Sequence, residues 1–265
     1  MLRRCWVLLL LTALGLPAQP PVNNFRFSIV GDRTGSAVPA VYEQVWREVD
    51  RLRPDFVINV GDTVQGRSDS SVEAEWQALR PLFHRYRRYP LYFVAGNHDI
   101  WSPFSAKIFE RETGRPPSYS FRFQNAHFTV LDNSQTADLE LKQLEFLESE
   151  LKANRSRDPK FVFFHKPFWI PFLQFQSGEF PLHRLAREYG VRYVVSGHLH
   201  FLLKMERDGV TYLQMGSSGA RIEPDFEKRV FYQHAVAEVR GSEVRITVHE
   251  LGPPHGQGRS LDLSR

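Results

Sequence analysis

The sequence predicts an α/β fold built around a largely parallel sheet, and three observations lead to this prediction. Between residues 25 and 95, three apolar β-like runs alternate with two amphipathic helical stretches. Because strands joined through a helix form right-handed crossovers, these three runs should lie parallel in one sheet. The later part of the chain shows alternating β patterns instead, and 265 residues are enough to bury one sizeable core.

The first hundred residues contain the predicted crossovers. The expected strands are 25–30, 55–60 and 90–95. Apolar residues spaced three and four apart predict a helix over 38–52, with Pro39 near its start. A second helix is predicted over 72–88, with a kink or break at Pro81, because proline removes a helical hydrogen bond.

The period of the apolar pattern changes after residue 118. The elements expected there are a hairpin of 119–123 and 126–131, a leucine-rich helix over 141–151, a strand at 161–164, a helix at 181–189 and a strand at 193–196. The remainder is expected to be mostly β, over 209–215, 230–240 and 243–251. The polar residues 252–265 are expected to be frayed.

Side chains that can bind metal ions follow five of the predicted strands, each directly after its apolar run. They are Asp32, Asp62, Asn97 with His98 and Asp99, His165, and His198 with His200. In α/β folds, groups at the carboxyl ends of strands meet in one crevice. Carboxylate oxygen and imidazole nitrogen together suit borderline divalent or trivalent metal ions. Since one ion rarely uses so many ligands, the sequence predicts a centre with two ions.

In their order and placement, these residues resemble the hallmark blocks of the calcineurin-like metallophosphoesterase superfamily. The matching blocks are Asp32, Gly61-Asp62, Gly96-Asn97-His98-Asp99, His165 and Gly197-His198-Leu199-His200. The resemblance covers about two thirds of the chain and implies a two-sheet αββα sandwich of the metallophosphoesterase type, with metals at its seam. It also implies an enzyme, a phosphoric ester hydrolase, with two divalent or trivalent metal ions (Mn, Fe or Zn) as cofactors.

The resemblance also implies which side chains hold each ion. It assigns Asp32, Asp62 and His200 to one ion, and Asp62, Asn97, His165 and His198 to the other. The shared carboxylate of Asp62 would present one oxygen to each ion and offset their repulsion at a separation of ~3.5–4 Å. The ions would lower the pKa of a bridging water toward neutrality, so that hydroxide attacks phosphorus in line.

Three further residues are candidates for catalysis or substrate binding. His98 is expected to protonate the leaving oxygen or to stabilise the developing charge, with Asp99 holding the His98 ring in orientation. Arg33 directly follows the first ligand, and its guanidinium could clamp a phosphate oxygen or form a surface salt bridge.

The first block departs from the superfamily pattern at Thr34, where many members carry a metal-binding histidine. The purple acid phosphatase branch lacks the same histidine, but fills the gap with a tyrosine three residues after the second-block aspartate. Here that position is Gln65. Its side-chain oxygen could complete the first metal or bind a metal-bound water, or Gln65 could have a plain loop role.

The composition and the amino-terminal sequence indicate the cellular compartment of the protein and limit its possible partners. Residues 1–19 resemble a secretory signal peptide, with Arg3 and Arg4 ahead of an apolar stretch, so we expect a single exported domain over 20–265, periplasmic or secreted. The apolar stretch is short for a bilayer, which argues against a stable membrane anchor, although an uncleaved anchor is the alternative. Cys5 is the only cysteine, so disulfides and thiolate ligands are excluded from the domain.

The expected partner is a small phosphoester substrate. The 34 basic and 30 acidic residues leave an excess of two once the leader arginines are removed, so we expect no nucleic-acid binding. Two segments rich in aromatic residues, 100–117 and 166–180, could stack on a substrate or pack as a hydrophobic lid. The alternative functions are a phosphodiesterase acting on cyclic nucleotides or nucleic acid, and a non-catalytic binding protein with the same fold.

Overall fold

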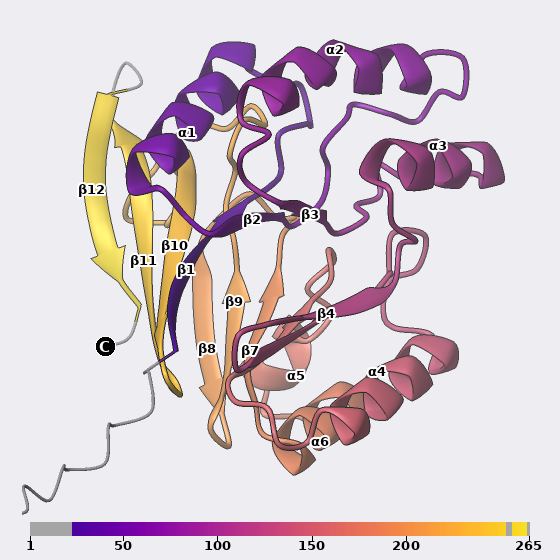
Figure 1. Ribbon diagram of the computed structural model, residues 1–265, viewed down its shortest axis with the longest axis vertical. Helices are drawn as coiled ribbons and strands as arrows, with labels where there is room; N and C mark the ends of the chain where they lie inside the picture. The colour runs from indigo at the N-terminus through magenta and orange to yellow at the C-terminus, as the bar shows by residue number, and fades with distance from the viewer. Residues whose placement is uncertain (1–22, 253–255, 264–265) are drawn as a thin grey trace, which may run out of the picture.

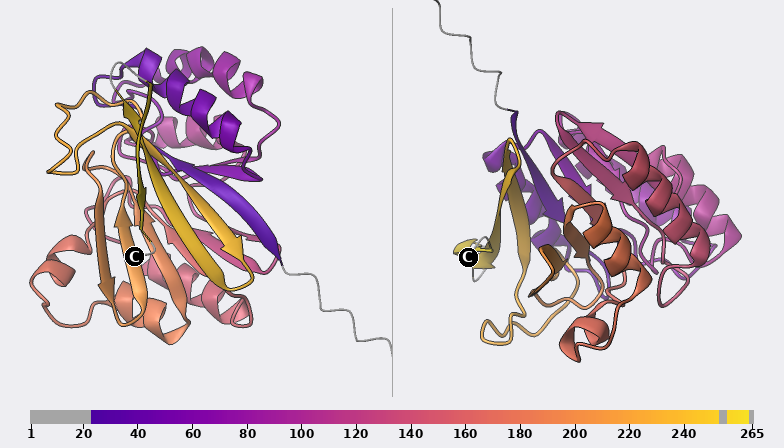
Figure 2. Two further views of the ribbon diagram at one scale, coloured as in Figure 1. Left: turned by 90° about the vertical axis from the view of Figure 1, so that its left-hand side faces the viewer. Right: turned by 90° about the horizontal axis from the view of Figure 1, so that it is seen from below.

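The structure is a computed structural model that describes residues 23–252 and 256–263, so the predicted leader lies outside the described residues. Two six-stranded sheets pack face to face, and helices cover the outer face of each sheet (Figures 1 and 2). This confirms the predicted two-sheet αββα sandwich. In the described part of the chain, no helix is long and apolar enough to cross a membrane.

The first sheet combines the predicted parallel strands with the end of the chain. Its strand order is β12-β11-β10-β1-β2-β3. The strands β1, β2 and β3 pair in parallel, and the pairs β1–β10, β10–β11 and β11–β12 are antiparallel. The bounds are β1 Asn24–Val30, β2 Phe56–Asn59, β3 Leu91–Phe93, β10 Gln233–Arg240, β11 Glu243–Gly252 and β12 Gly256–Asp262. The strand β12 was missed, since the sequence predicted a frayed end.

Three helices lie on the side of the first sheet. They are α1 Pro39–Leu52, α2 Val72–Arg85 and α3 Pro103–Thr113. The helix α2 continues through Pro81 and therefore does not break there. Glu73 and Glu75 in its first turn and Arg85 in its last turn complement the helix dipole. The helix α3 lies within the first aromatic-rich segment, 100–117, for which the sequence predicted no helix.

The second sheet contains the remaining strands in the order β4-β5-β6-β7-β9-β8. Its bounds are β4 Tyr119–Phe123, β5 Ala126–Val130, β6 Lys160–Phe163, β7 Val191–Ser196, β8 Leu203–Arg207 and β9 Val210–Gln214. The helices beside it are α4 Leu141–Ala153, α5 Ile170–Gln174 and α6 Pro181–Glu188. The predicted strand at 209–215 is β9, and the sequence analysis missed its hairpin partner β8.

Phenylalanine rings from both sheets form the seam of the sandwich. Phe27 and Phe56 stack with ring centroids 5.0 Å apart, and Phe128 and Phe161 stack at 4.9 Å. Phe27 meets Phe128 edge to face at 5.4 Å, which joins the two stacks across the seam. All four side chains are fully buried. This packing fixes the two sheets relative to each other and so aligns their strand ends.

Candidate metal centre

The predicted ligands of the first and second blocks lie at the carboxyl ends of β1 and β2, in a strained backbone conformation. Asp32 has φ 49° and Asp62 has φ 55°. His198 and His200 after β7 have φ 85° and 59°. Left-handed backbone in residues other than glycine costs of order 1–3 kcal/mol and gathers at functional sites. The backbone therefore bends at the two histidines themselves.

Three of the predicted ligands converge most closely. Ligand atoms of Asp62, His165 and His198 all lie within 4.8 Å of one another. His165 Nε2 is 3.2 Å from Asp62 Oδ2, and the His165 and His198 ring centroids are 5.1 Å apart. His165 Nδ1 donates to the carbonyl oxygen of Val60 at 2.9 Å, which leaves Nε2 directed to the centre. Metal-ligating histidines are typically oriented by such a hydrogen bond from the ring nitrogen that does not bind the metal.

Asp32 and His200 lie beside this group. His200 Nε2 is 3.6 Å from Asp32 Oδ1, and the same oxygen accepts a hydrogen bond from the His198 amide at 2.8 Å. Among the described residues, no hydrogen-bond partner is found for the buried atoms Asp32 Oδ2, Asn97 Oδ1 and His165 Nε2. Buried polar atoms are rarely left unpaired. Oxygen- and nitrogen-binding metal ions would satisfy these atoms, so the donor set fits such ions.

The protonation of the centre follows from burying carboxylates close together. Burial raises the pKa of Asp32 well above its usual range, and the nearby Asp62 carboxylate acts in the same direction. Burial would also raise the pKa of Asp62, but the charge of His165 outweighs it and lowers that pKa below its usual range. For His165, burial lowers the pKa, but Asp62 reverses the effect and raises the pKa to about 9. The Asp62 carboxylate therefore favours a positive charge at the position of the His165 ring.

Two glycines allow the carboxylates to approach the neighbouring backbone. A Cβ atom at Gly96 would collide with the Asp62 carboxylate and amide nitrogen. A Cβ atom at Gly197 would collide with Asp32 Oδ2. Gly96 and Gly197 are therefore needed because a larger residue would not fit at the centre. The backbone of Gly197 is not in the left-handed region.

His98 lies next to the shared carboxylate. Its backbone amide donates to Asp62 Oδ1 at 2.9 Å, and its ring Nδ1 donates to the Gln65 carbonyl oxygen at 2.6 Å. This contact fixes the tautomer and leaves Nε2 as the second ring nitrogen. The ring is therefore oriented by a backbone carbonyl.

The expectation that Asp99 orients the His98 ring is wrong. Asp99 Oδ1 accepts from the amides of Thr63 and Val64 at 2.8 and 3.2 Å, and Oδ2 accepts from the Gly96 amide at 2.9 Å. Burial, with the neighbouring Asp62, raises the pKa of Asp99 to about 7. Asp99 therefore ties the loop after β2 to the loop after β3, and it supports the ligands instead of the ring.

Gln65 contacts the first loop through its side-chain oxygen. Gln65 Oε1 accepts from the Thr34 hydroxyl at 2.5 Å and from the amides of Ser36 and Gly35 at 3.2 and 3.4 Å. Three donors thus occupy the oxygen that could have been a metal ligand. Of the roles considered for Gln65, the structure favours the loop role, and Thr34 is its partner.

Arg33 links the same two loops from the other side. One guanidinium nitrogen donates to the Thr63 carbonyl oxygen at 3.1 Å, and the guanidinium carbon lies 5.8 Å from the centre of the Tyr42 ring. These contacts account for the position of Arg33 without a substrate. Phosphate clamping by Arg33 stays a prediction.

The sequence analysis missed several residues that support the centre. Asn133 Oδ1, after β5, accepts from the amides of His165 and Lys166 at 3.1 Å each. Ser218 Oγ accepts from the Gly31 amide at 3.1 Å, beside the first ligand. Asn133 follows an apolar run just as the ligands do, and this position was an available signal. Nothing in the sequence pairs Ser218 with Gly31.

The aromatic-rich segment 166–180 is mainly packing. Trp169 is fully buried and donates to the Ser196 hydroxyl at 3.2 Å, while Phe172 stacks on Phe180 at 4.7 Å. Phe175, in contrast, is 73% exposed. Lys166 Nζ donates to two backbone carbonyl oxygens, of Ser134 and Thr136, at 2.7 and 2.9 Å. This segment therefore matches the hydrophobic-lid alternative more closely than a stacking platform.

Comparisons with known proteins give one consistent result. A family model described as calcineurin-like phosphoesterase matches residues 35–202. Human tartrate-resistant acid phosphatase type 5 is 27% identical over an alignment of 262 positions that spans 79% of this chain and 78% of that protein.

Two solved structures have a similar fold. Purple acid phosphatase PPD1 from yellow lupin seeds has a TM-score of 0.67 and 13% identity, over 91% of this chain and 53% of that one. The chain thus spans about half the length of the lupin protein. GAP50, described as the anchor in the inner membrane complex of Plasmodium, has a TM-score of 0.61 and 15% identity, over 91% and 88% of the two chains.

Proposed function

The chain belongs to the calcineurin-like phosphoesterase family, which makes it a phosphoric ester hydrolase, and we propose that it is an exported enzyme with a dinuclear metal centre. The observation that carries the proposal is the convergence of Asp62, His165 and His198 beside two unpaired buried oxygens, of Asp32 and Asn97. Export rests on the signal-like sequence at 1–19.

Two ions would be held by seven donor groups from six residues, with Asp62 shared. One ion would take Asp32, Asp62 and His200, and the other Asp62, Asn97, His165 and His198. Bound ions would supply charge neutralisation of the phosphoryl group and a water acidified to react near neutral pH. The metal could be Mn, Fe or Zn, and all of these accept oxygen and nitrogen ligands.

The side chains of the protein would position the ester and move one proton. His98 Nδ1 carries the proton that is shared with the Gln65 carbonyl, so Nε2 would have a proton to donate to the ester only when both ring nitrogens are protonated. From there it would stabilise charge on a phosphoryl oxygen or protonate the leaving oxygen. Asp99 would keep the two loops that carry Asp62 and His98 at a constant separation.

The decisive experiment replaces the shared carboxylate, by Asp62→Asn, and measures metal content together with hydrolysis of p-nitrophenyl phosphate and bis-p-nitrophenyl phosphate. We expect the variant to fold, to lose metal and to lose hydrolysis, because a buried charge between two cations is removed. Asp55→Asn is the matched control, since Asp55 is an exposed aspartate at the opposite end of β2.

Three outcomes of this experiment separate the functions. Two fully bound metals and a near-normal rate in Asp62→Asn would reject Asp62 as the ligand shared by the two ions. A wild-type protein that binds no metal and cleaves neither ester would be the non-catalytic binding protein. Preference for the diester over the monoester would identify the phosphodiesterase. Export is tested separately, by locating the protein in cell fractions and sequencing its amino terminus.

A further inference from the structure

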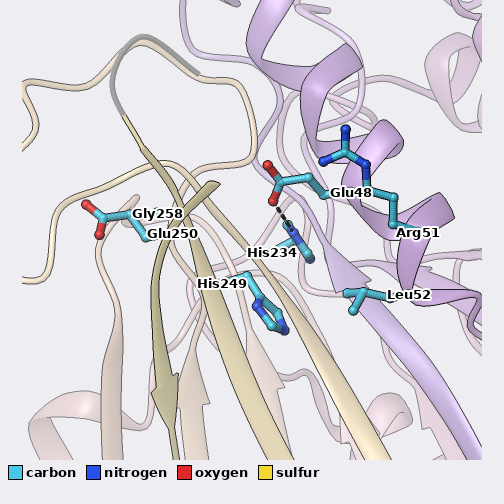
Figure 3. Close-up of a pocket in the computed structure, with 7 residues that line it drawn as sticks. All are labelled: Glu48, Arg51, Leu52, His234, His249, Glu250 and Gly258. Carbon is cyan, nitrogen blue, oxygen red and sulfur yellow. Dashed lines mark hydrogen bonds and ion pairs between the residues drawn. The ribbon is translucent and has the colours of Figure 1, made fainter. Parts of the chain in front are cut away.

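A second group of histidine and carboxylate side chains lies on the helix-covered face of the first sheet. His234 on β10 and His249 on β11 are direct cross-strand neighbours, and Glu48 on α1 contacts His234 (Figure 3). The three residues line a cavity of about 100 Å³, together with Arg51, Leu52, Glu250 and Gly258. None of them belongs to the candidate metal centre.

Each histidine of this cluster has one ring nitrogen bound and the other buried and unpaired. His234 Nε2 lies 3.1 Å from Glu48 Oε2, and His249 Nδ1 lies 3.0 Å from the Ser260 hydroxyl. Within the described residues, His234 Nδ1 and His249 Nε2 are buried without a hydrogen-bond partner. His234 is only 1% exposed, and Glu48 is 7% exposed. Buried polar atoms are rarely left without a partner, so two such nitrogens call for a ligand.

This arrangement is the one that metal-ligating histidines adopt. A ligating imidazole typically donates its second N–H to a carboxylate, which fixes its tautomer and makes it a better ligand. Glu48 is placed to do this for His234, and Gln44 in turn donates to Glu48 Oε1 at 3.2 Å. The His234 and His249 rings lie 5.1 Å apart at an angle of 20°, as expected for opposed residues of an antiparallel pair.

We propose that His234 and His249 hold a second, mononuclear site for a divalent transition-metal ion, separate from the candidate catalytic centre. Imidazole nitrogen favours ions such as Zn²⁺, Ni²⁺ and Cu²⁺ over Mg²⁺ and Ca²⁺. In the described part of the chain, three protein donors converge only at Asp62, His165 and His198. The second site therefore has two protein ligands and is completed by water, for which the cavity has room.

The site would join the helix layer to the sheet near the end of the chain. It links β10 to β11 directly, and through Glu48 it links both strands to α1. The residue before His234, Gln233, donates its amide to the Ser217 carbonyl oxygen at 2.8 Å, in the loop that supports Gly31. An ion here is therefore a stabilising element that takes no part in hydrolysis.

The test uses Zn²⁺ alone as the probe, on the full folded protein. Zinc per chain is measured by mass spectrometry after dialysis against graded free Zn²⁺, with hydrolysis of p-nitrophenyl phosphate measured in parallel. His249→Gln removes one ligand at a half-buried position, and His84→Gln is the control at an exposed histidine outside the cluster. We expect His249→Gln to bind one zinc fewer than wild type, at unchanged kcat/KM, and His84→Gln to match wild type.

A second variant keeps both ligands and changes only the carboxylate that orients His234. Glu48→Gln should weaken this one zinc by ~10–100-fold, the usual loss when a supporting carboxylate is removed. Added Zn²⁺ should also raise the Tm of His249→Gln less than that of wild type, because one stabilising ion is missing. Equal zinc content in wild type, His249→Gln and Glu48→Gln would overturn the proposal. Loss of zinc and hydrolysis together in His249→Gln would also overturn it, because the ion would then belong to the catalytic centre.

Discussion

At the scale of single residues, the His98 ring is the clearest case of a side chain whose role depends on one contact. The Gln65 carbonyl oxygen, 2.6 Å away, can only accept a hydrogen bond, so Nδ1 carries the proton. A backbone acceptor does not change its charge with pH or with substrate. The ring is therefore held in one tautomer without a carboxylate partner, in contrast to the expected pairing with Asp99.

For His98→Ala we predict that kcat falls by ~10²–10⁴, which is the usual contribution of a general acid. The fall should be smaller for p-nitrophenyl phosphate, whose leaving group needs little protonation, than for alkyl phosphates. Metal content should stay as in wild type. Steady-state kinetics with both substrate types and metal analysis check this, with His84→Ala as the control. An equal loss for good and poor leaving groups would leave charge stabilisation as the role of His98.

At the scale of elements, the loop from β1 to α1 depends on the loop after β2. Gln65 Oε1 gathers three donors from Thr34, Gly35 and Ser36. The same loop packs against the His200 ring, since a Cβ atom at Gly35 would lie 3.0 Å from His200 Cε1. Gln65 would therefore affect the ion held by Asp32 and His200 indirectly, by fixing the position of the loop between β1 and α1.

We predict that Gln65→Ala and Thr34→Val each weaken the ion at Asp32 and His200 by ~10–100-fold, as loss of a supporting contact does. Because Thr34→Val removes one of the three contacts that Gln65→Ala removes, the double variant should be no worse than Gln65→Ala. Metal titration of the three proteins is the measurement, with Thr247→Val on β11 as the control. A weakened ion in Gln65→Ala alone, with Thr34→Val unchanged, would make Gln65 a ligand after all.

At the scale of the whole molecule, one buried histidine away from the centre should make the stability of the fold sensitive to acid. His127 on β5 is fully buried, with Nε2 3.5 Å from the Glu150 carboxylate on α4. Burial lowers the pKa of His127 to about 4; Glu150 opposes this shift, while Arg122 and Lys160 add to it. The unfolded chain, with an ordinary histidine pKa of about 6.5, binds more protons than the folded one between these two values.

The free energy of unfolding should therefore fall as the pH drops from about 6.5 to about 4, and be fully restored above 6.5. His127→Gln should make this dependence shallower, because the titrating group is gone. Urea unfolding of both proteins at several pH values between 4 and 7.5 checks the prediction. The same slope in His127→Gln and wild type would show that other groups cause the acid sensitivity.

The sequence alone determined the order of strands and helices through residue 100, the strand ends that carry ligands, and the family. These features are local, because an apolar run followed by a polar residue indicates the end of a strand whatever the rest of the fold. The missed elements α3, β8 and β12 have weaker patterns, since their apolar residues are few and interrupted by charge.

Only the tertiary structure decided which groups meet across loops. The Gln65 oxygen contacts Thr34, 31 residues away, and Glu48 contacts His234 across 186 residues. Asp99 accepts hydrogen bonds from three backbone amides, and His234 and His249 each have one buried ring nitrogen without a partner among the described residues. Such pairings depend on the packing of the sheets and helices and on strained backbone at Asp32, Asp62, His198 and His200. A residue pattern cannot identify the contact partner of a side chain when only the fold brings the two together. These contacts could therefore be found only in the structure.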